Sequence, residues 1–185
     1  MKGLIYLEDG TVFRGYGFGY PCTNVGELVF NTSMTGYQEI LTDPSYKGQI
    51  INMTYPLIGN YGINSLDNES DKIHASGFIV KDISLNPSNA ASEKNINEWL
   101  KEMKVPGVYG VDTRRIAKKI RNGGTVKCVI TNEEKTVSEL KEICDNAELR
   151  NDQMKTAGVS EYEHIPGMGC KVAVLDFGVK AGIIE

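Results

Sequence analysis

Residues 4–18 read Leu-Ile-Tyr-Leu-Glu-Asp-Gly-Thr-Val-Phe-Arg-Gly-Tyr-Gly-Phe, with two strand-like arms on either side of Asp9-Gly10. An Asp-Gly pair between apolar arms favours a tight two-residue turn, so the sequence predicts a β-hairpin near the N-terminus. Glycines 15, 17 and 19 punctuate the second arm. We interpret them as marks of bulges or backbone crowding, because no helix follows to supply the clustered N–H groups of a phosphate loop.

Further strands follow the hairpin along the chain. Val, Ile, Phe and Tyr are concentrated in stretches that favour strands, at residues 27–31, 49–55, 77–83, 108–111 and 125–131. A short helix is expected at 37–41, and residues 64–71 are polar enough to form an exposed loop. The mixture of strands and helices predicts an α/β domain.

Three longer helices are predicted from their caps and their apolar faces. The first has Ser92 as its N-cap and ends before Pro106-Gly107, and its inward face carries Ile96, Trp99, Leu100 and Met103. The second runs from the cap Asp112 through residues 113–121 to Gly123-Gly124. A capping box, Thr136 to Glu139, opens the third, with inward positions Val137, Leu140, Ile143 and Cys144.

Composition and charge exclude several classes of protein. The chain has 185 residues, 41% of them hydrophobic, which fits one domain or one domain plus a tail. Its net charge of −4 argues against nucleic acid or an anionic membrane as the partner. The basic run 114–121 alternates with apolar residues, so we interpret it as the solvated face of a helix and leave open a contact with an acidic protein. With neither a membrane-length apolar run nor a signal-peptide core, the expected location is the cytoplasm.

The cysteines and histidines do not form a recognisable catalytic or metal-binding pattern. Four widely spaced cysteines, at 22, 128, 144 and 170, are expected to be reduced thiols, with Cys128 and Cys144 in the core. Cys170 precedes a strand signal, whereas a nucleophile elbow places its residue after a strand. The two histidines, His74 and His164, lie far from any cysteine pair, so we expect ordinary surface or loop histidines and no metal site.

The polar segment 31–46 is the best candidate for a binding loop. It reads Asn-Thr-Ser-Met-Thr-Gly-Tyr-Gln-Glu-Ile-Leu-Thr-Asp-Pro-Ser-Tyr, with hydroxyls and amides between two predicted strands. Asp43-Pro44-Ser45-Tyr46 is a strong turn signal, because Asp and Ser side chains bond nearby backbone N–H groups. A structural turn and a functional loop are equally consistent with this composition.

The end of the sequence predicts a change of fold. Residues 171–178, Lys-Val-Ala-Val-Leu-Asp-Phe-Gly, form an apolar run typical of a strand buried on both faces of a parallel sheet. Pro166-Gly167-Met168-Gly169 before it has the composition of a linker. A single buried strand leaves its backbone groups unpaired, so we expect residues 171–185 to begin a second, truncated domain after a first domain at 1–150 and a linker at 151–170.

Several of these stretches together resemble the small subunits of carbamoyl phosphate synthetase. The resemblance covers nearly the entire chain and is carried by residues 7–11, 26–46, 54–62, 110–114 and 172–180. It implies a three-layer β/β/α domain of the swivelling type, followed by the first strand of a class I glutamine amidotransferase domain. It also implies a ligase that makes carbamoyl phosphate from glutamine, bicarbonate and ATP for arginine and pyrimidine biosynthesis.

The resemblance also assigns roles to residues and partners. Ser45 matches a serine that contacts glutamine in the family, so it is the expected substrate-binding residue. The family's Cys, His and Glu catalytic residues have no counterpart in this sequence, and residues 1–185 alone are expected to be inactive. The implied partner is the large subunit, which uses ATP and Mg²⁺, and this chain is expected to bind no cofactor. Two alternatives are a free-standing binding module that uses the 31–46 loop and, less favoured, an independent cysteine hydrolase.

Overall fold

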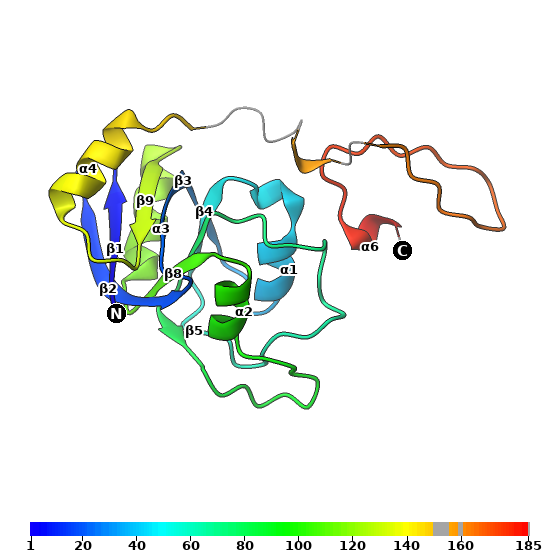
Figure 1. Cartoon of the computed structure of the whole chain (residues 1–185), viewed down its shortest axis with the longest axis horizontal. Coiled ribbons are helices and arrows are strands. Elements are labelled where there is room, and N and C mark those ends of the chain that lie inside the picture. Colours follow the sequence, from blue (N-terminus) through cyan, green and yellow to red (C-terminus); the bar gives the residue numbers. More distant parts are fainter. Residues whose placement is uncertain (150–155, 159–160, 185) are drawn as a thin grey trace.

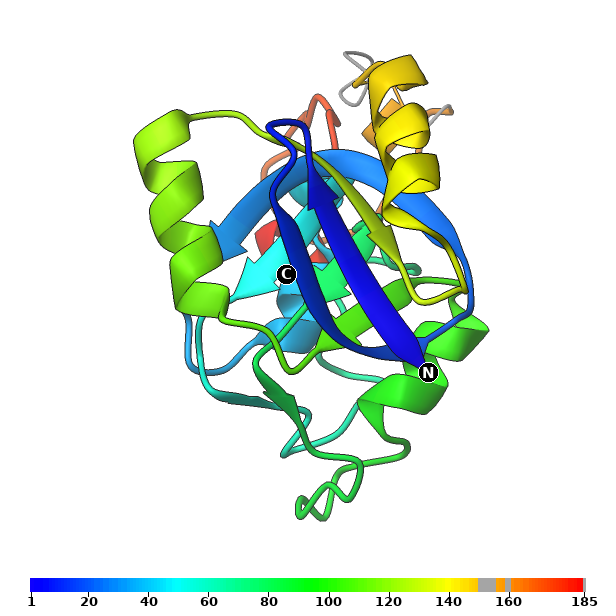
Figure 2. The same cartoon turned by 90° about the vertical axis from the view of Figure 1, so that its left-hand side faces the viewer.

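A computed structural model describes residues 1–149, 156–158 and 161–184, and it places the sequence in the α/β class. Seven strands form one sheet whose order is β1-β2-β8-β6-β4-β3-β9, and β9 pairs with β1 to close a barrel (Figures 1 and 2). These strands are β1 (Lys2–Leu7), β2 (Val12–Gly19), β3 (Thr23–Asn31), β4 (Gln49–Met53), β6 (Gly77–Ile79), β8 (Pro106–Tyr109) and β9 (Lys127–Thr131). The run β3-β4-β6-β8 is parallel and the remaining pairs are antiparallel.

The N-terminal hairpin is confirmed, but its turn differs from the prediction. β1 and β2 pair in the register Tyr6↔Val12 to Lys2↔Tyr16. The Gly10 N–H donates to the Leu7 carbonyl at 2.8 Å, and the Leu7 N–H donates to the Thr11 carbonyl at 2.9 Å. Gly10 has φ 84°, so the loop has three residues and ends in a glycine bulge, which is another common hairpin geometry. The prediction of a two-residue turn was therefore wrong.

Backbone crowding explains the glycines of β2, as predicted. A Cβ atom on Gly17 would lie 2.5 Å from the Cβ of Asn132, and one on Gly15 would overlap the Tyr109 carbonyl. The Asn132 amide in turn donates to the Phe18 carbonyl at 2.7 Å. These glycines let neighbouring backbone and side chains approach β2 closely, and they do not form a ligand loop.

The predicted helices are present, but one of the predicted caps was wrong. Met103, predicted on an inward helix face, is 38% exposed, because it lies at the C-terminal cap of its helix. In α2 (Ile96–Glu102) the N-cap is Asn95, whose side chain accepts from the Glu98 N–H at 3.0 Å. Ser92 lies too far upstream of the first helical residue, and its hydroxyl donates to the Lys94 carbonyl instead. Pro106-Gly107 opens β8 instead of directly ending α2. The caps of α3 (Thr113–Gly123) and α4 (Val137–Asn146) are as predicted, including the complete capping box at Thr136.

Buried side chains form separate clusters on the two faces of the closed sheet. The interior holds Ile5, Leu28, Ile50, Ile79 and Ile130 together with Ile116 and Ile120 of α3. Outside, α1 (Tyr37–Thr42) and α2 pack on one side, while α4 covers β1 and β9 on another (Figure 1). Cys128 and Cys144 are fully buried in these clusters, which confirms their predicted place in the core.

Smaller elements modify one of the predicted strands and the predicted turn at 43–46. The stretch 77–83 is divided between β6 and β7 (Asp82–Ile83), and β7 pairs with β5 (Leu57–Ile58) in a separate two-stranded sheet. The segment after α1 forms a 3₁₀ helix, η1 (Pro44–Tyr46), where the sequence predicted a turn. None of the helices that the structure describes is long and apolar enough to span a membrane.

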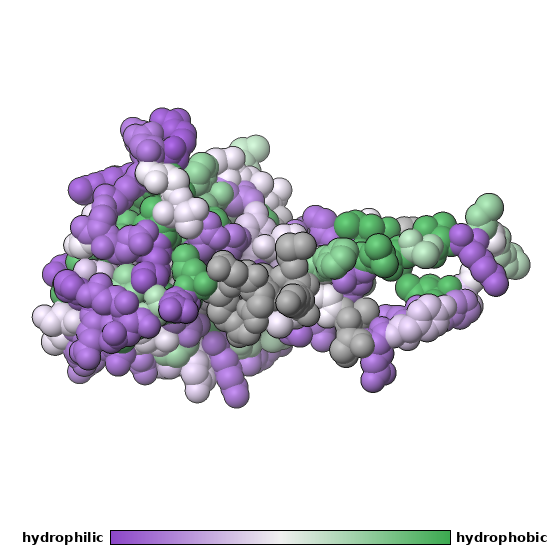
Figure 3. Space-filling view, turned by 90° about the horizontal axis from the view of Figure 1, so that it is seen from above, coloured by the Kyte–Doolittle hydropathy of each residue, from purple (hydrophilic) through white to green (hydrophobic). Residues whose placement is uncertain are grey.

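The apolar stretch 171–178 is neither a strand nor buried, so this prediction was wrong. It runs as an irregular segment before α6 (Ala181–Ile184), and Val172 and Leu175 are 81% and 83% exposed. Figure 3 shows hydrophobic surface along the extension that projects from the domain. No described strand lies beside the segment, so its N–H and C=O groups have no sheet to join and its side chains nothing to pack on.

Candidate functional site

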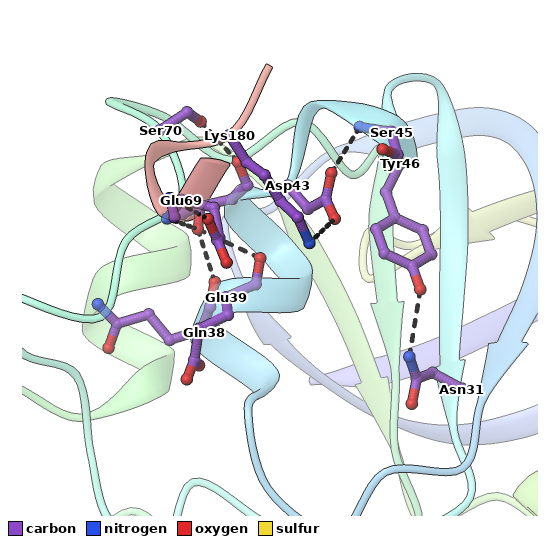
Figure 4. Close-up of polar contacts among 11 residues, drawn as sticks. Asn31, Gln38, Glu39, Asp43, Ser45, Tyr46, Glu69, Ser70 and Lys180 are labelled. Carbon is purple, nitrogen blue, oxygen red and sulfur yellow. Dashed lines mark hydrogen bonds and ion pairs between the residues drawn. The ribbon is translucent and has the colours of Figure 1, made fainter. Parts of the chain in front are cut away.

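The polar segment 31–46 forms a helical connection between two parallel strands. β3 ends at Asn31, α1 and η1 follow, and the chain then enters β4. The Asp43 carboxylate caps η1 by accepting the Ser45 N–H at 2.9 Å (Figure 4). At the other side of the turn, the Asn31 side-chain amide donates to the Tyr46 hydroxyl at 3.1 Å. Both the short helix and the turn chemistry were correctly predicted from the sequence.

Ser45 presents a free hydroxyl at this turn. The residue is exposed, and within the described residues its side-chain hydroxyl forms no hydrogen bond, whereas its backbone N–H donates to Asp43. Pro44 before it is buried, which anchors the turn in the domain. The hydroxyl can therefore donate to, or accept from, a polar ligand without first breaking an internal bond.

The C-terminal segment returns to the same turn. Lys180 Nζ lies 3.4 Å from Asp43 Oδ2, so one carboxylate holds both Ser45 and Lys180 (Figure 4). Gly178 packs so closely on Pro44 that a Cβ there would lie 3.0 Å from the proline Cβ. The Asp176 carboxylate accepts the N–H groups of Gly178 and Val179, which closes a turn at this point.

A second loop supports the same corner of the molecule. The N–H groups of Ala181 and Gly182 donate to the backbone carbonyl and carboxylate of Glu69, at 2.9 and 3.2 Å. The Glu69 N–H donates to Thr42 at the end of α1, and the Ser70 hydroxyl donates to the Thr42 carbonyl. Loop 64–71 is thus tied to α1 rather than being freely exposed along its whole length.

Gln38 is the polar residue that sequence reasoning missed. It is fully buried in α1, and its side-chain amide donates to the Asn64 carbonyl and to Asn68 Oδ1. Its carbonyl oxygen accepts the Asn64 N–H at 3.1 Å. The tyrosine pair Tyr37 and Tyr61 stacks at 4.2 Å beside it, and the Tyr61 hydroxyl accepts the first N–H groups of α1. These contacts fix α1, and with it the start of η1.

Burial shifts the pKa values of two titratable groups near the turn, Glu39 and His74. Burial raises the pKa of Glu39, and the neighbouring Asp67 and Glu69 raise it further. His74 lies in a loop, one of the two environments predicted for the histidines, and is only 9% exposed. Burial lowers the pKa of His74, and Lys72 and Lys47 add to this effect. His164 is exposed, and the described residues contain no cluster of three or more His, Cys, Asp or Glu side chains suited to a metal.

The cysteines do not have the environment of a nucleophile. All four are free thiols. Burial raises the pKa of Cys22 to about 11 and also raises the pKa values of Cys128 and Cys144. A raised pKa disfavours the reactive thiolate. Cys170 lies exposed in the irregular segment before residue 171 and follows no strand, as a nucleophile elbow would require.

Comparisons with known proteins place these features in one family. A family model described as "Carbamoyl-phosphate synthase small chain, CPSase domain" matches residues 5–130. A carbamoyl phosphate synthase small chain from Clostridium acetobutylicum is 62% identical over 185 residues, covering 100% of this chain and 53% of the relative. Relatives of the same name from Fusobacterium nucleatum and Clostridium perfringens are both 47% identical, covering 98% and 100% of this chain and 51% and 53% of their own lengths.

The similarity thus covers essentially the whole of this chain but only part of each relative. The chain spans about half the length of the curated relatives it matches. A solved aminopeptidase from Aneurinibacillus sp. strain AM-1 has a TM-score of 0.41 and 16% identity, over 70% of this chain and 30% of its own, which is too weak to bear on the fold or the function. The family match and the 62% identity establish that the chain belongs to the carbamoyl-phosphate synthase small chain family.

Proposed function

We propose that this chain is the N-terminal part of the glutamine-hydrolysing subunit of a carbamoyl phosphate synthetase. The observation that carries the proposal is the 62% identity to a small chain over all 185 residues. In this proposal the complete enzyme is a cytoplasmic ligase for arginine and pyrimidine biosynthesis. It uses glutamine, bicarbonate and ATP, and the ATP and Mg²⁺ are bound by the large subunit.

The proposal divides the chain into three parts. Residues 1–150 are a three-layer β/β/α domain of the swivelling type, residues 151–170 are a linker, and residues 171–185 begin a class I amidotransferase domain. The exposed apolar side chains of Val172, Leu175 and Phe177 support the last assignment, because such residues are normally packed in a core. The contacts of Gly178 and Lys180 with the Ser45 turn also support it, because they join the two parts at the candidate site.

In this arrangement the chain holds the substrate, and residues of another domain perform the chemistry. Ser45 binds a polar group of glutamine through its free hydroxyl, and Asp43 keeps the turn in place. The nucleophilic cysteine and its His and Glu partners belong to the amidotransferase domain. The ammonia that they release passes to the large subunit, so residues 1–185 contribute a substrate contact and a docking surface.

Substitution of Ser45 in the complete subunit tests this role. We expect Ser45→Phe to raise the KM for glutamine at least tenfold, because a bulky ring replaces a hydrogen-bonding hydroxyl in the site. Ammonia-dependent carbamoyl phosphate synthesis should change less than twofold, since ammonia bypasses the glutamine site. The matched control is Ser88→Phe, at another exposed serine, which should alter neither activity. Equal loss of both activities in Ser45→Phe would instead assign the turn a purely structural role.

A further inference from the structure

Helix α3 carries two sets of cations with different surroundings. One set interacts within the domain, because the Arg115 guanidinium lies 5.7 Å from the centre of the Phe13 ring and the Lys119 ammonium pairs with Asp9. The other set, Arg114, Lys118 and Arg121, is exposed, and none of the three forms an ion pair within the part of the chain that the structure describes.

The unpaired cations line a groove. In Figure 2, α3 lies beside β3 and β4. The groove is lined on the α3 side by Arg114, Lys118 and Arg121. Its other side is formed by Phe30, Thr32 and Thr54, and Ala117 completes the apolar surface between the cations. A second hollow shares Phe30 and Arg121 and continues along β3 to Glu27, with Gly124 and Thr125 on its other side. The groove therefore joins an apolar surface to a row of three positive charges about one helix turn apart.

The position of Arg114 is unfavourable for the isolated helix. It lies in the first turn of α3, where the positive end of the helix dipole repels cations. No acidic residue is present in that turn, and the cap Asp112 is already engaged by the Arg115 N–H. An anionic partner lying along the groove would relieve this repulsion and would also neutralise Lys118 and Arg121.

We propose that this groove, lined by Arg114, Lys118, Arg121 and Phe30, docks an acidic segment of the large subunit. The inference rests on the proposed function, which requires such a partner. Charge complementarity favours an acidic polypeptide, because the groove gathers three cations that form no ion pair within the described residues. This local positive charge stands out in a chain whose net charge is −4. The apolar surface at Phe30 and Ala117 suits a segment that also presents an apolar side chain, which a free inorganic anion lacks.

Binding between the purified large subunit and the complete small subunit tests the proposal. The groove variant is R114Q/K118Q/R121Q, and the matched control is K2Q/K81Q/K101Q, which removes three exposed lysines from other surfaces. We expect the groove variant to bind about tenfold more weakly at low salt, with a smaller salt dependence, and the control to change less than twofold. The variant R114K/R121K keeps the charges and should retain most of the affinity. Equal thermal unfolding of all variants would confirm that they fold.

Other outcomes would overturn the inference in recognisable ways. Unchanged binding by the groove variant, or equal losses in the groove and control variants, would contradict a specific groove. Displacement of the large subunit by inorganic phosphate or by a short DNA duplex at constant ionic strength would assign the groove to a small anion or to nucleic acid. If the unmodified small subunit did not bind the large subunit, the proposed function itself would fail, and the inference would fail with it.

Discussion

Strand β9 and the stretch 171–175 have similar compositions but different structures. Residues 127–131 are Lys-Cys-Val-Ile-Thr, and residues 171–175 are Lys-Val-Ala-Val-Leu. The first stretch lies between β1 and β3, and four of its five side chains are buried. The second has no strand on either side in the described chain, and Val172, Val174 and Leu175 are more than half exposed. An apolar, β-branched stretch becomes a strand only where neighbouring strands complete its hydrogen bonds.

Truncation of one side chain in each stretch gives the largest expected contrast. We expect Ile130→Ala to lower the free energy of unfolding by about 2–5 kcal/mol, because it leaves a cavity in the fully packed interior. Val174→Ala should change it by less than about 0.5 kcal/mol, because that side chain is already in solvent. Urea unfolding of residues 1–185 measures both values. A loss above about 1 kcal/mol for Val174→Ala would show that the stretch packs against the domain in solution.

The two histidines give a smaller contrast, between the packed domain and the exposed C-terminal segment. The pKa of buried His74 is lowered in the folded state, so the unfolded chain binds its proton more readily. The stability from neutral His74 is therefore fully present above the unfolded pKa near 6.5 and is lost as the pH falls below it. We expect the drop in unfolding free energy below pH 6.5 to be smaller in His74→Gln. His164→Gln, at an exposed position, is the control substitution, and urea titrations from pH 7.5 to about 5 compare the two variants.

Local chemistry explains which parts of the fold could be predicted from the sequence. The caps at Asp112 and Thr136 and the apolar faces of their helices act within a few residues, and they were predicted correctly. The N-cap of α2 was not, because Ser92 and Asn95 are both good caps and tertiary packing of Ile96 selects the later start. Closure of the sheet by β9 and β1 could not be predicted, because it joins residues more than 120 positions apart by nonlocal pairing.

The candidate site shows the same division between local and distant interactions. The Asp43 cap and the turn at Ser45 follow from adjacent residues, whereas the contact of Asp43 with Lys180 spans 137 positions and has no signal in the sequence pattern. Buried Gln38 has a detectable signal, since it is a polar residue on the inward face of a short helix. The assignment of Ser45 to glutamine rests on family resemblance, because its geometry defines a free hydroxyl but not the ligand.

Glutamate release is the most direct test of the central claim that residues 1–185 hold the substrate and lack the catalytic groups. The purified chain should release glutamate from glutamine no faster than a blank without protein, whereas the complete subunit with its large partner should turn glutamine over. Release by the chain in proportion to its concentration, lost on substitution of Cys22 or Cys170, would contradict the account. That result would place the nucleophile within these residues.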